Sequence, residues 1–196
     1  ELLSNGTKVK INVTGTQVKF MPGIVHNGDG MDLEFDCPSE RCVSYYLETI
    51  VPVRIFGKVP LTITLRGVTN NDIDPSVDTV KEVLLGYLAK VGVEGASLKI
   101  VKRGLKEDPN GEVILFLPNI KDLPNIDLID PGKIKRIRGV VYSCKTNPIL
   151  SNSIVSGIRS VFNDYIPDVW IHLDHHKGEA AGNSKGLGVA LRLETS

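Results

Sequence analysis

The sequence is short of cysteine, of aromatic residues and of long apolar runs. Its three cysteines, Cys37, Cys42 and Cys144, are an odd number without paired C-x-x-C spacing, which argues against a disulfide framework and against a zinc site. No apolar run approaches the roughly 20 residues that a membrane-spanning helix needs, and the first residues do not form a signal peptide. These absences favour a reducing compartment, cytosol or nucleus, and exclude a membrane partner.

An excess of either charge is also absent, because 23 Lys and Arg residues balance 23 Asp and Glu residues. The whole chain therefore exerts no net attraction on nucleic acid or on a membrane, and any basic binding surface must be local. With 196 residues, 41% of them hydrophobic, the chain can form one or two cores.

Periodicity predicts an α/β protein in which strands and helices alternate. Two strands are expected around the "TGT" at 14–16, and a turn at 26–30. Between 31 and 120 the expected order is β-α-β-α-β-β, and residues 1–30 resemble the closing β-β of an earlier copy of this unit. We therefore expect the end of a first repeat at 1–30, a βαβαββ repeat at 31–121, a proline-rich linker at 122–133 and a β-α-β-β unit at 134–196.

Capping residues predict where the helices begin. Ser39 is expected to cap the first helix, and Pro52 to kink or end it. Asn147 is expected to cap the last helix, with Pro148 in its first position. For the middle helix the sequence "NNDIDPSVD" favours Asp74 as the N-cap, followed by Pro75.

The acidic stretch that contains this cap could also be a metal site, since Asn71, Asp72, Asp74 and Asp78 all carry oxygen ligands. The spacing is not that of a calcium loop, so we favour the cap and expect no metal site. In "HLDHH", strand alternation places His172 and Asp174 on one face and His175 on the other, which is typical of the end of a hairpin. An acid/base pair of Asp174 with His175 or His176 is the alternative, but no nucleophile lies nearby in sequence. "KGEAAGNSKGLG" lacks the spacing of a phosphate loop and is expected to be a flexible hairpin loop.

Two basic runs are candidate binding sites for RNA or for a protein partner. The first contains Lys133, Lys135, Arg136 and Arg138, and the second contains Lys102 and Arg103. Such clusters can follow a phosphate backbone. They can equally be lysine-rich strand edges that prevent pairing between sheets.

Several motifs resemble the RNA 3'-terminal phosphate cyclase family: "DLEFDCPSERCVSYYLETIVPV", "LRGVTNNDIDPSVDTVK", "LKIVKRG" and "DPGKIKRIRGVVYS". The last of these and "KGEAAGNSKGLGVALRLET" are similar to its eukaryotic ribosome-biogenesis branch. The resemblance implies a large domain of repeated βαβαββ units with a small inserted α/β domain, of which this chain is a fragment. It also implies early pre-rRNA processing for the small ribosomal subunit in the nucleolus. The implied partners are pre-rRNA, a small nucleolar ribonucleoprotein and a nucleolar GTPase.

Cyclisation of RNA 3'-phosphates with ATP and Mg²⁺ is the alternative that the family implies. No residue here matches the motif of the histidine that cyclases adenylylate. Where cyclases carry a glycine triplet, "KRGLKEDPNGEV" keeps only Gly111 and adds Glu107 and Asp108, which would repel phosphate. We therefore expect a binding or scaffolding protein with no catalytic residue and no cofactor. The residues also supply no nuclease site for the endoribonuclease role that has been suggested for this branch.

Overall fold

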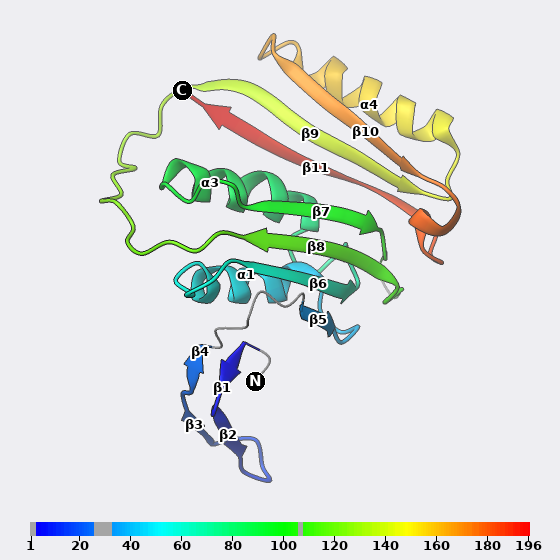
Figure 1. The fold of residues 1–196 in the computed structure, drawn as a ribbon. Helices are drawn as coiled ribbons and strands as arrows, with labels where there is room; N and C mark the ends of the chain where they lie inside the picture. The colour runs from blue at the N-terminus through cyan, green and yellow to red at the C-terminus, as the bar shows by residue number, and fades with distance from the viewer. Residues whose placement is uncertain (1–2, 26–32, 106–107) are drawn as a thin grey trace.

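A computed structural model describes residues 3–25, 33–105 and 108–196, which form a mixed α/β structure with four small sheets (Figure 1). The turn expected at 26–30 and Glu107 lie outside the described residues. Near the N-terminus, β1 (Ser4–Asn5) pairs with β4 (Ile24–Val25), and β2 (Lys8–Ile11) pairs with β3 (Val18–Met21), both antiparallel. The two strands predicted around residues 14–16 are confirmed as the hairpin β2–β3.

The larger sheet has the strand order β5-β6-β8-β7. It contains β5 (Leu33–Asp36), β6 (Leu61–Gly67), β7 (Ser97–Lys102) and β8 (Gly111–Leu117). β5 runs parallel to β6, and the other pairs are antiparallel. Along β6 and β8, buried residues alternate with partly exposed ones, as expected of a sheet that is covered on one face. The helices α1 (Val43–Arg54) and α3 (Leu85–Lys90) cover that face and share one apolar core with it.

The helix expected between residues 77 and 91 is confirmed, with one local irregularity. It runs through α2 (Val77–Thr79), a π-helical segment η1 (Val80–Leu84) and α3. All five predicted apolar positions belong to the core or pack against it: Val77, Val80, Leu84, Leu88 and Val91. The helix ends where Gly92 has a φ of +87°, a left-handed conformation that glycine adopts without strain.

Two predicted caps are wrong. α1 begins at Val43, and its N-cap is Cys42 rather than Ser39. α2 begins at Val77, where the Oγ of Ser76 accepts a hydrogen bond from the backbone N–H of Thr79 at 3.1 Å.

Asp74 does not cap α2, because its carboxylate binds donors on the segment before α1 instead. Its Oδ2 accepts the backbone N–H of Cys42 at 2.8 Å, and its carboxylate accepts hydrogen bonds from the Arg41 guanidinium. Asp74 therefore fixes the start of α1 instead of capping α2.

The second sheet has β9 (Ile134–Cys144) in the centre, β10 (Val169–His176) parallel to it and β11 (Gly186–Thr195) antiparallel. Helix α4 (Pro148–Phe162) makes the crossover between β9 and β10. The predicted cap is confirmed, since Asn147 Oδ1 accepts the backbone N–H of Ile149 at 3.0 Å. A short 3-10 helix, η2 (Gly178–Ala181), precedes β11.

The second sheet lies beside α3 and β7, with α4 on its outer face (Figure 1). The segment after β7 is bonded to the segment around η2. The backbone N–H of Arg103 donates to the carbonyl of Ala180 at 3.1 Å, and that of Leu105 donates to Ser184 Oγ at 3.1 Å. These bonds join the two segments, and a cavity lies between the two sheets.

We predict that Asp74→Ala lowers the free energy of unfolding by about 1–3 kcal/mol, because it leaves the buried Cys42 amide without its acceptor. Ser76→Ala should cost about 1 kcal/mol, the usual cost of losing an N-cap. The exposed Asp72 provides the matched control, and Asp72→Ala should change stability by less than about 0.5 kcal/mol. Urea denaturation of the three variants measures all of these values, and an Asp74→Ala protein as stable as Asp72→Ala would contradict our assignment.

The same carboxylate predicts a pH dependence. Hydrogen bonds from Arg41 lower the pKa of Asp74 from 3.8 to about 2. Because the folded-state pKa is depressed, its stabilisation is complete above the unfolded pKa and is lost as the pH falls through about 2. The difference in stability between the wild type and Asp74→Ala should therefore shrink steadily between pH 5 and pH 2. A constant difference over this range would contradict the prediction.

Candidate functional site

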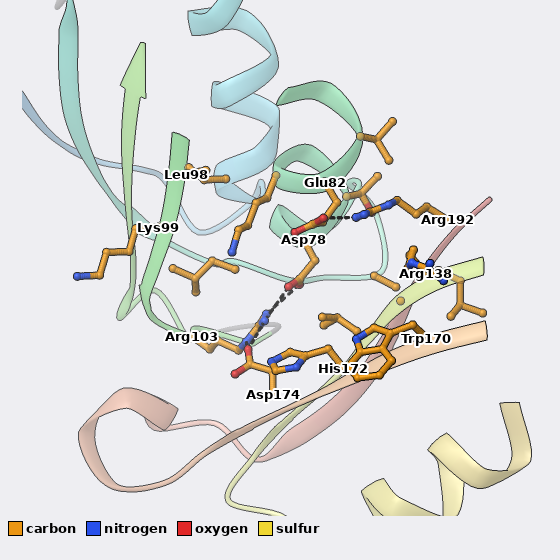
Figure 2. A pocket seen from close by; sticks show the side chains of 18 of the residues that line it. Asp78, Glu82, Leu98, Lys99, Arg103, Arg138, Trp170, His172, Asp174 and Arg192 are labelled. Carbon is orange, nitrogen blue, oxygen red and sulfur yellow. Dashed lines mark hydrogen bonds and ion pairs between the residues drawn. The ribbon is translucent and has the colours of Figure 1, made fainter. Parts of the chain in front are cut away.

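A cavity of about 480 Å³ lies between the second sheet and the α2–η1 and β7 segments (Figure 2). Its floor on the second sheet follows from the strand register, since residues paired across β10, β9 and β11 lie side by side. Trp170, Arg138 and Arg192 form one such row, and His172, Val140 and Ala190 form the next. The second row consists largely of small side chains, which leaves room above it. The wall opposite includes Lys81, Glu82, Leu98, Lys99 and Ile100.

A buried arginine closes one end of this cavity. Arg103 is 1% exposed, and its guanidinium makes a bidentate ion pair with Asp78, with N–O distances of 2.7 and 2.9 Å. Its Nε and Nη2 donate to Asp174 at 3.0 and 2.6 Å, and Nη1 also donates to Asn70 at 3.1 Å. The guanidinium carbon lies 4.6 Å from the centroid of the Tyr142 ring. The Arg103 side chain thus connects two layers of the molecule. The first layer is the larger sheet with the helices α1 to α3, to which Asp78 of α2 belongs, and the second layer is the second sheet, to which Asp174 of β10 belongs.

The electrostatics of this cluster favour the charged forms. Burial alone would raise the pKa of Asp174, but hydrogen bonds from Arg103 and from His176 Nε2, 2.8 Å away, outweigh it and lower that pKa. Burial works against the charge of Arg103, but its two carboxylate partners raise its pKa above the ordinary value. Arg103 and Asp174 are therefore held in their charged forms, and one guanidinium is shared between two carboxylates.

Further ion pairs lie on both sides of the cavity. Arg192 of β11 pairs with Glu82 of η1, and so makes a second bridge between the layers. Arg138 pairs with Asp168 at 2.7 and 2.8 Å, and these hydrogen bonds lower the pKa of Asp168. By contrast, no ion-pair partner is found for Lys81 or Lys99 within the described part of the chain.

The structure divides the basic residues that the sequence singled out. In the first run, alternation along β9 places Arg136 and Arg138 on the cavity face and Lys135 on the α4 face. Arg138 lines the cavity, whereas Lys133, Lys135 and Arg136 are exposed near the start of β9.

The second run divides more sharply. Lys102 is half-buried on β7, opposite Glu112. Arg103 is enclosed by its acidic partners, which gives it a structural role rather than a direct contact with RNA or protein. The other five residues remain predicted binding residues.

The acidic stretch does not converge on one point. Asp74 binds Arg41, Asp78 binds Arg103, and Asp72 is exposed. Within residues 3–25, 33–105 and 108–196, no group of three or more His, Cys, Asp or Glu side chains is placed to hold a metal ion. No helix among these residues is long and apolar enough to cross a membrane.

The histidines follow the predicted alternation. His172 and His176 line the cavity with Asp174, whereas His175 turns to the other face and makes a 2.6 Å hydrogen bond to Ser143 Oγ. Of the alternatives weighed for Asp174, the partner it contacts is His176, and the pair is part of the Arg103 network.

The region that differs from the cyclase pattern is used for packing. A Cβ at Gly111 would collide with the carbonyl oxygen of Gly67 and would lie 2.6 Å from the amide nitrogen of Gly104. The Asp108 carboxylate accepts the backbone N–H of Asn183 at 2.6 Å and that of Ser184 at 3.3 Å. These bonds and those from Asn110 outweigh burial and lower the pKa of Asp108. Asp108 therefore anchors the loop before β11.

Sequence reasoning missed the cavity and three of its side chains, Trp170, Glu82 and Arg192. The alternation of 169–176 contained a signal for Trp170, because a tryptophan beside His172 and Asp174 on one strand face is unusual on a plain hairpin end. The pairing of Glu82 with Arg192 joins residues 110 positions apart, and no local pattern indicates it.

Comparison of the sequence with known proteins places the chain in a family. The model of the RNA 3'-terminal phosphate cyclase family matches residues 1–181, and the chain belongs to this family. Within it, the chain is similar to the cyclase-like branch. It is 45% identical over 196 residues to the RNA 3'-terminal phosphate cyclase-like protein of Homo sapiens, covering 99% of this chain and 52% of the human protein.

More distant relatives agree with this placement. The probable cyclase-like protein of Drosophila melanogaster is 41% identical over 196 residues, covering 99% of this chain and 50% of that protein. The rRNA processing protein rcl1 of Schizosaccharomyces pombe is 38% identical over 200 residues, covering the whole of this chain and 54% of that protein. The chain thus spans about half the length of the curated relatives it matches.

We predict that Arg103→Met destabilises the protein by about 3–5 kcal/mol, because it leaves the buried carboxylate of Asp78 and the partly buried one of Asp174 without the guanidinium. Lys102→Met, on the neighbouring half-buried residue, should cost less than about 1 kcal/mol. Adding Asp78→Asn to Arg103→Met should restore part of the loss, since it removes one of the uncompensated charges. Denaturation in urea compares the variants, and equal losses for Arg103→Met and Lys102→Met would contradict the buried network.

Proposed function

We propose that this chain is part of a cyclase-like factor that acts in early pre-rRNA processing for the small ribosomal subunit, as a binding and scaffolding protein in the nucleolus. The observation that carries the proposal is similarity along the whole chain to the cyclase-like proteins, one of which is named an rRNA processing protein. Its partners on this proposal are pre-rRNA, a small nucleolar ribonucleoprotein and a nucleolar GTPase.

The same resemblance supports a division of the chain. Residues 31–121 are one βαβαββ repeat of a large domain, and 1–30 are the end of the repeat before it. Residues 122–133 are a linker, and 134–196 form most of a small inserted domain. Support comes from the order of elements on either side of the exposed segment between β8 and β9.

A binding function, rather than cyclisation, is supported by the segment that differs from the cyclase glycine pattern. Gly111 is needed where three backbone segments approach closely, and Asp108 holds the loop before β11. Neither is arranged to bring a nucleotide phosphate close to the backbone. ATP-dependent cyclisation of RNA ends is the alternative function, and it belongs to the family whose model the chain matches.

We predict that the full-length protein forms no stable AMP adduct when it is incubated with ATP labelled in its α-phosphate. Cyclisation requires an adenylylated histidine, so the adduct is the direct sign of the alternative. A true cyclase treated in parallel provides the positive control. A stable labelled adduct on the full-length protein would overturn the proposal in favour of cyclisation.

The exposed basic residues at the start of β9 are the proposed contact for the GTPase. Lys135 has no ion-pair partner among the described residues, and Arg136 is only loosely held, 3.4 Å from Asp168 and 3.9 Å from Glu194. These cations are therefore available to an acidic protein surface. Because the chain carries no net charge, a local protein contact accounts for them better than a general attraction to RNA.

We predict that Lys135→Glu combined with Arg136→Glu abolishes GTPase binding and leaves RNA affinity unchanged, because the variant places negative charge opposite an acidic surface. Lys10→Glu combined with Lys19→Glu makes the same charge change on the β2–β3 hairpin and should affect neither ligand. Calorimetry with the GTPase and anisotropy with RNA give the two readouts. Lost RNA binding with intact GTPase binding would assign the basic strand end to RNA instead.

A further inference from the structure

The chain contains a single tryptophan, and the fold places it at the cavity rather than in a core. Trp170 is 63% exposed, while its neighbour Ile171 is buried on the α4 side of the sheet. Strand alternation therefore turns the indole toward the cavity, where it lies beside His172 and near Arg138 (Figure 2). An exposed tryptophan on a regular strand offers a rigid, flat apolar surface to a ligand.

The surroundings of Trp170 suit a flat group that carries negative charge. Across the sheet, its row continues with the guanidinium groups of Arg138 and Arg192. Next to that row, Val140 and Ala190 leave space beside His172. The resulting cavity of about 480 Å³ lies within the range of roughly 300–1,000 Å³ that is typical of small-ligand sites.

The charges that line the cavity leave a positive surplus. Its three acids are all held by arginines: Asp78 and Asp174 by Arg103, and Glu82 by Arg192. Arg103 carries one charge against two carboxylates, but over the whole lining five Lys and Arg residues outnumber these three acids. Lys81 also lines the cavity and is exposed, without an ion-pair partner among the described residues. The side chain of Lys99, another lining residue, points away from Trp170 (Figure 2).

We propose that this cavity binds a nucleotide unit of single-stranded RNA, with a base stacked on Trp170 and phosphate near Lys81. The inference rests on the proposed role in pre-rRNA processing, and it names the site and the form of the RNA. Bases stack on aromatic side chains whatever their sequence, whereas the bases of a duplex are already stacked on one another. The site therefore selects an unpaired nucleotide and not a particular sequence.

The first experiment uses the fluorescence of Trp170, which no other tryptophan of this chain obscures. A six-nucleotide oligoadenylate should quench the fluorescence in a saturable way. A duplex RNA of sixteen base pairs should bind at least about ten-fold more weakly at this site. AMP tests whether a free nucleotide, rather than an RNA strand, is the ligand of the cavity. If AMP bound as tightly as the oligonucleotide, the assignment to RNA would be overturned.

The second experiment measures anisotropy of a labelled oligoadenylate with variants of the chain. Trp170→Leu should weaken binding about 5- to 150-fold, the usual effect of losing one stacked base. Trp170→Phe keeps an aromatic ring and should retain most of the affinity. Tyr165, an exposed aromatic residue outside the cavity lining, provides the matched control, and Tyr165→Leu should bind like the wild type.

The contact of Lys81 with phosphate is tested by salt dependence. Lys81→Ala should reduce the slope of log affinity against log salt by about 0.7, the value for one phosphate contact of a single strand. Lys58→Ala, on an exposed lysine away from the cavity lining, should leave the slope unchanged. Circular dichroism confirms that each variant is folded, and Trp170→Phe supplies the comparison if Trp170→Leu is not.

Unchanged RNA affinity in folded Trp170→Leu would overturn this inference, and RNA bound elsewhere on the chain would leave the proposed function standing. The proposed function fails separately if the full-length protein does not associate with pre-rRNA in nuclear extract. In that case, quenching by oligoadenylate would still report on the cavity.

Discussion

The ion pairs of Arg103 are the interaction on which the arrangement of the two layers depends. A buried guanidinium is costly unless all of its donors are engaged, and here two carboxylates and an amide oxygen engage them. Since Asp78 belongs to the first layer and Asp174 to the second, the charge is satisfied only when both layers are in place. The network thus sets the distance between the sheets, and with it the width of the cavity that Trp170 faces.

Local features of the sequence predicted the elements well. The strands alternate clearly, and the helix from Val77 carries a regular apolar face, so each element follows from its own residues. The cap at Asn147 was equally local, because its acceptor and donor lie two residues apart. The prediction of Asp74 as the cap of the middle helix failed because Asp74 binds Arg41, which lies 33 residues away. Local reasoning could not find that partner.

The candidate site was less predictable, because it is made of pairings between distant segments. Arg103 stood out as part of a basic run, but its burial depends on Asp174, which belongs to another sheet. Arg138 was found for its charge, while the tryptophan beside it in the strand register was not. The register of β9 with β10 and β11 decides which side chains share a row. A single sequence carries that information only weakly, since a shift of one residue reverses the faces.

The Arg103 network also bears on the order in which the chain acquires its structure during synthesis. Arg103 and Asp174 are 71 residues apart, so at about 5–20 residues per second the ribosome delivers the second carboxylate roughly 4 to 14 s after the arginine. During that interval the guanidinium has only Asp78 and Asn70 as partners, and the face that later meets the second sheet stays open to water. The charged network of Arg103 is thus completed only when β10 has left the ribosome.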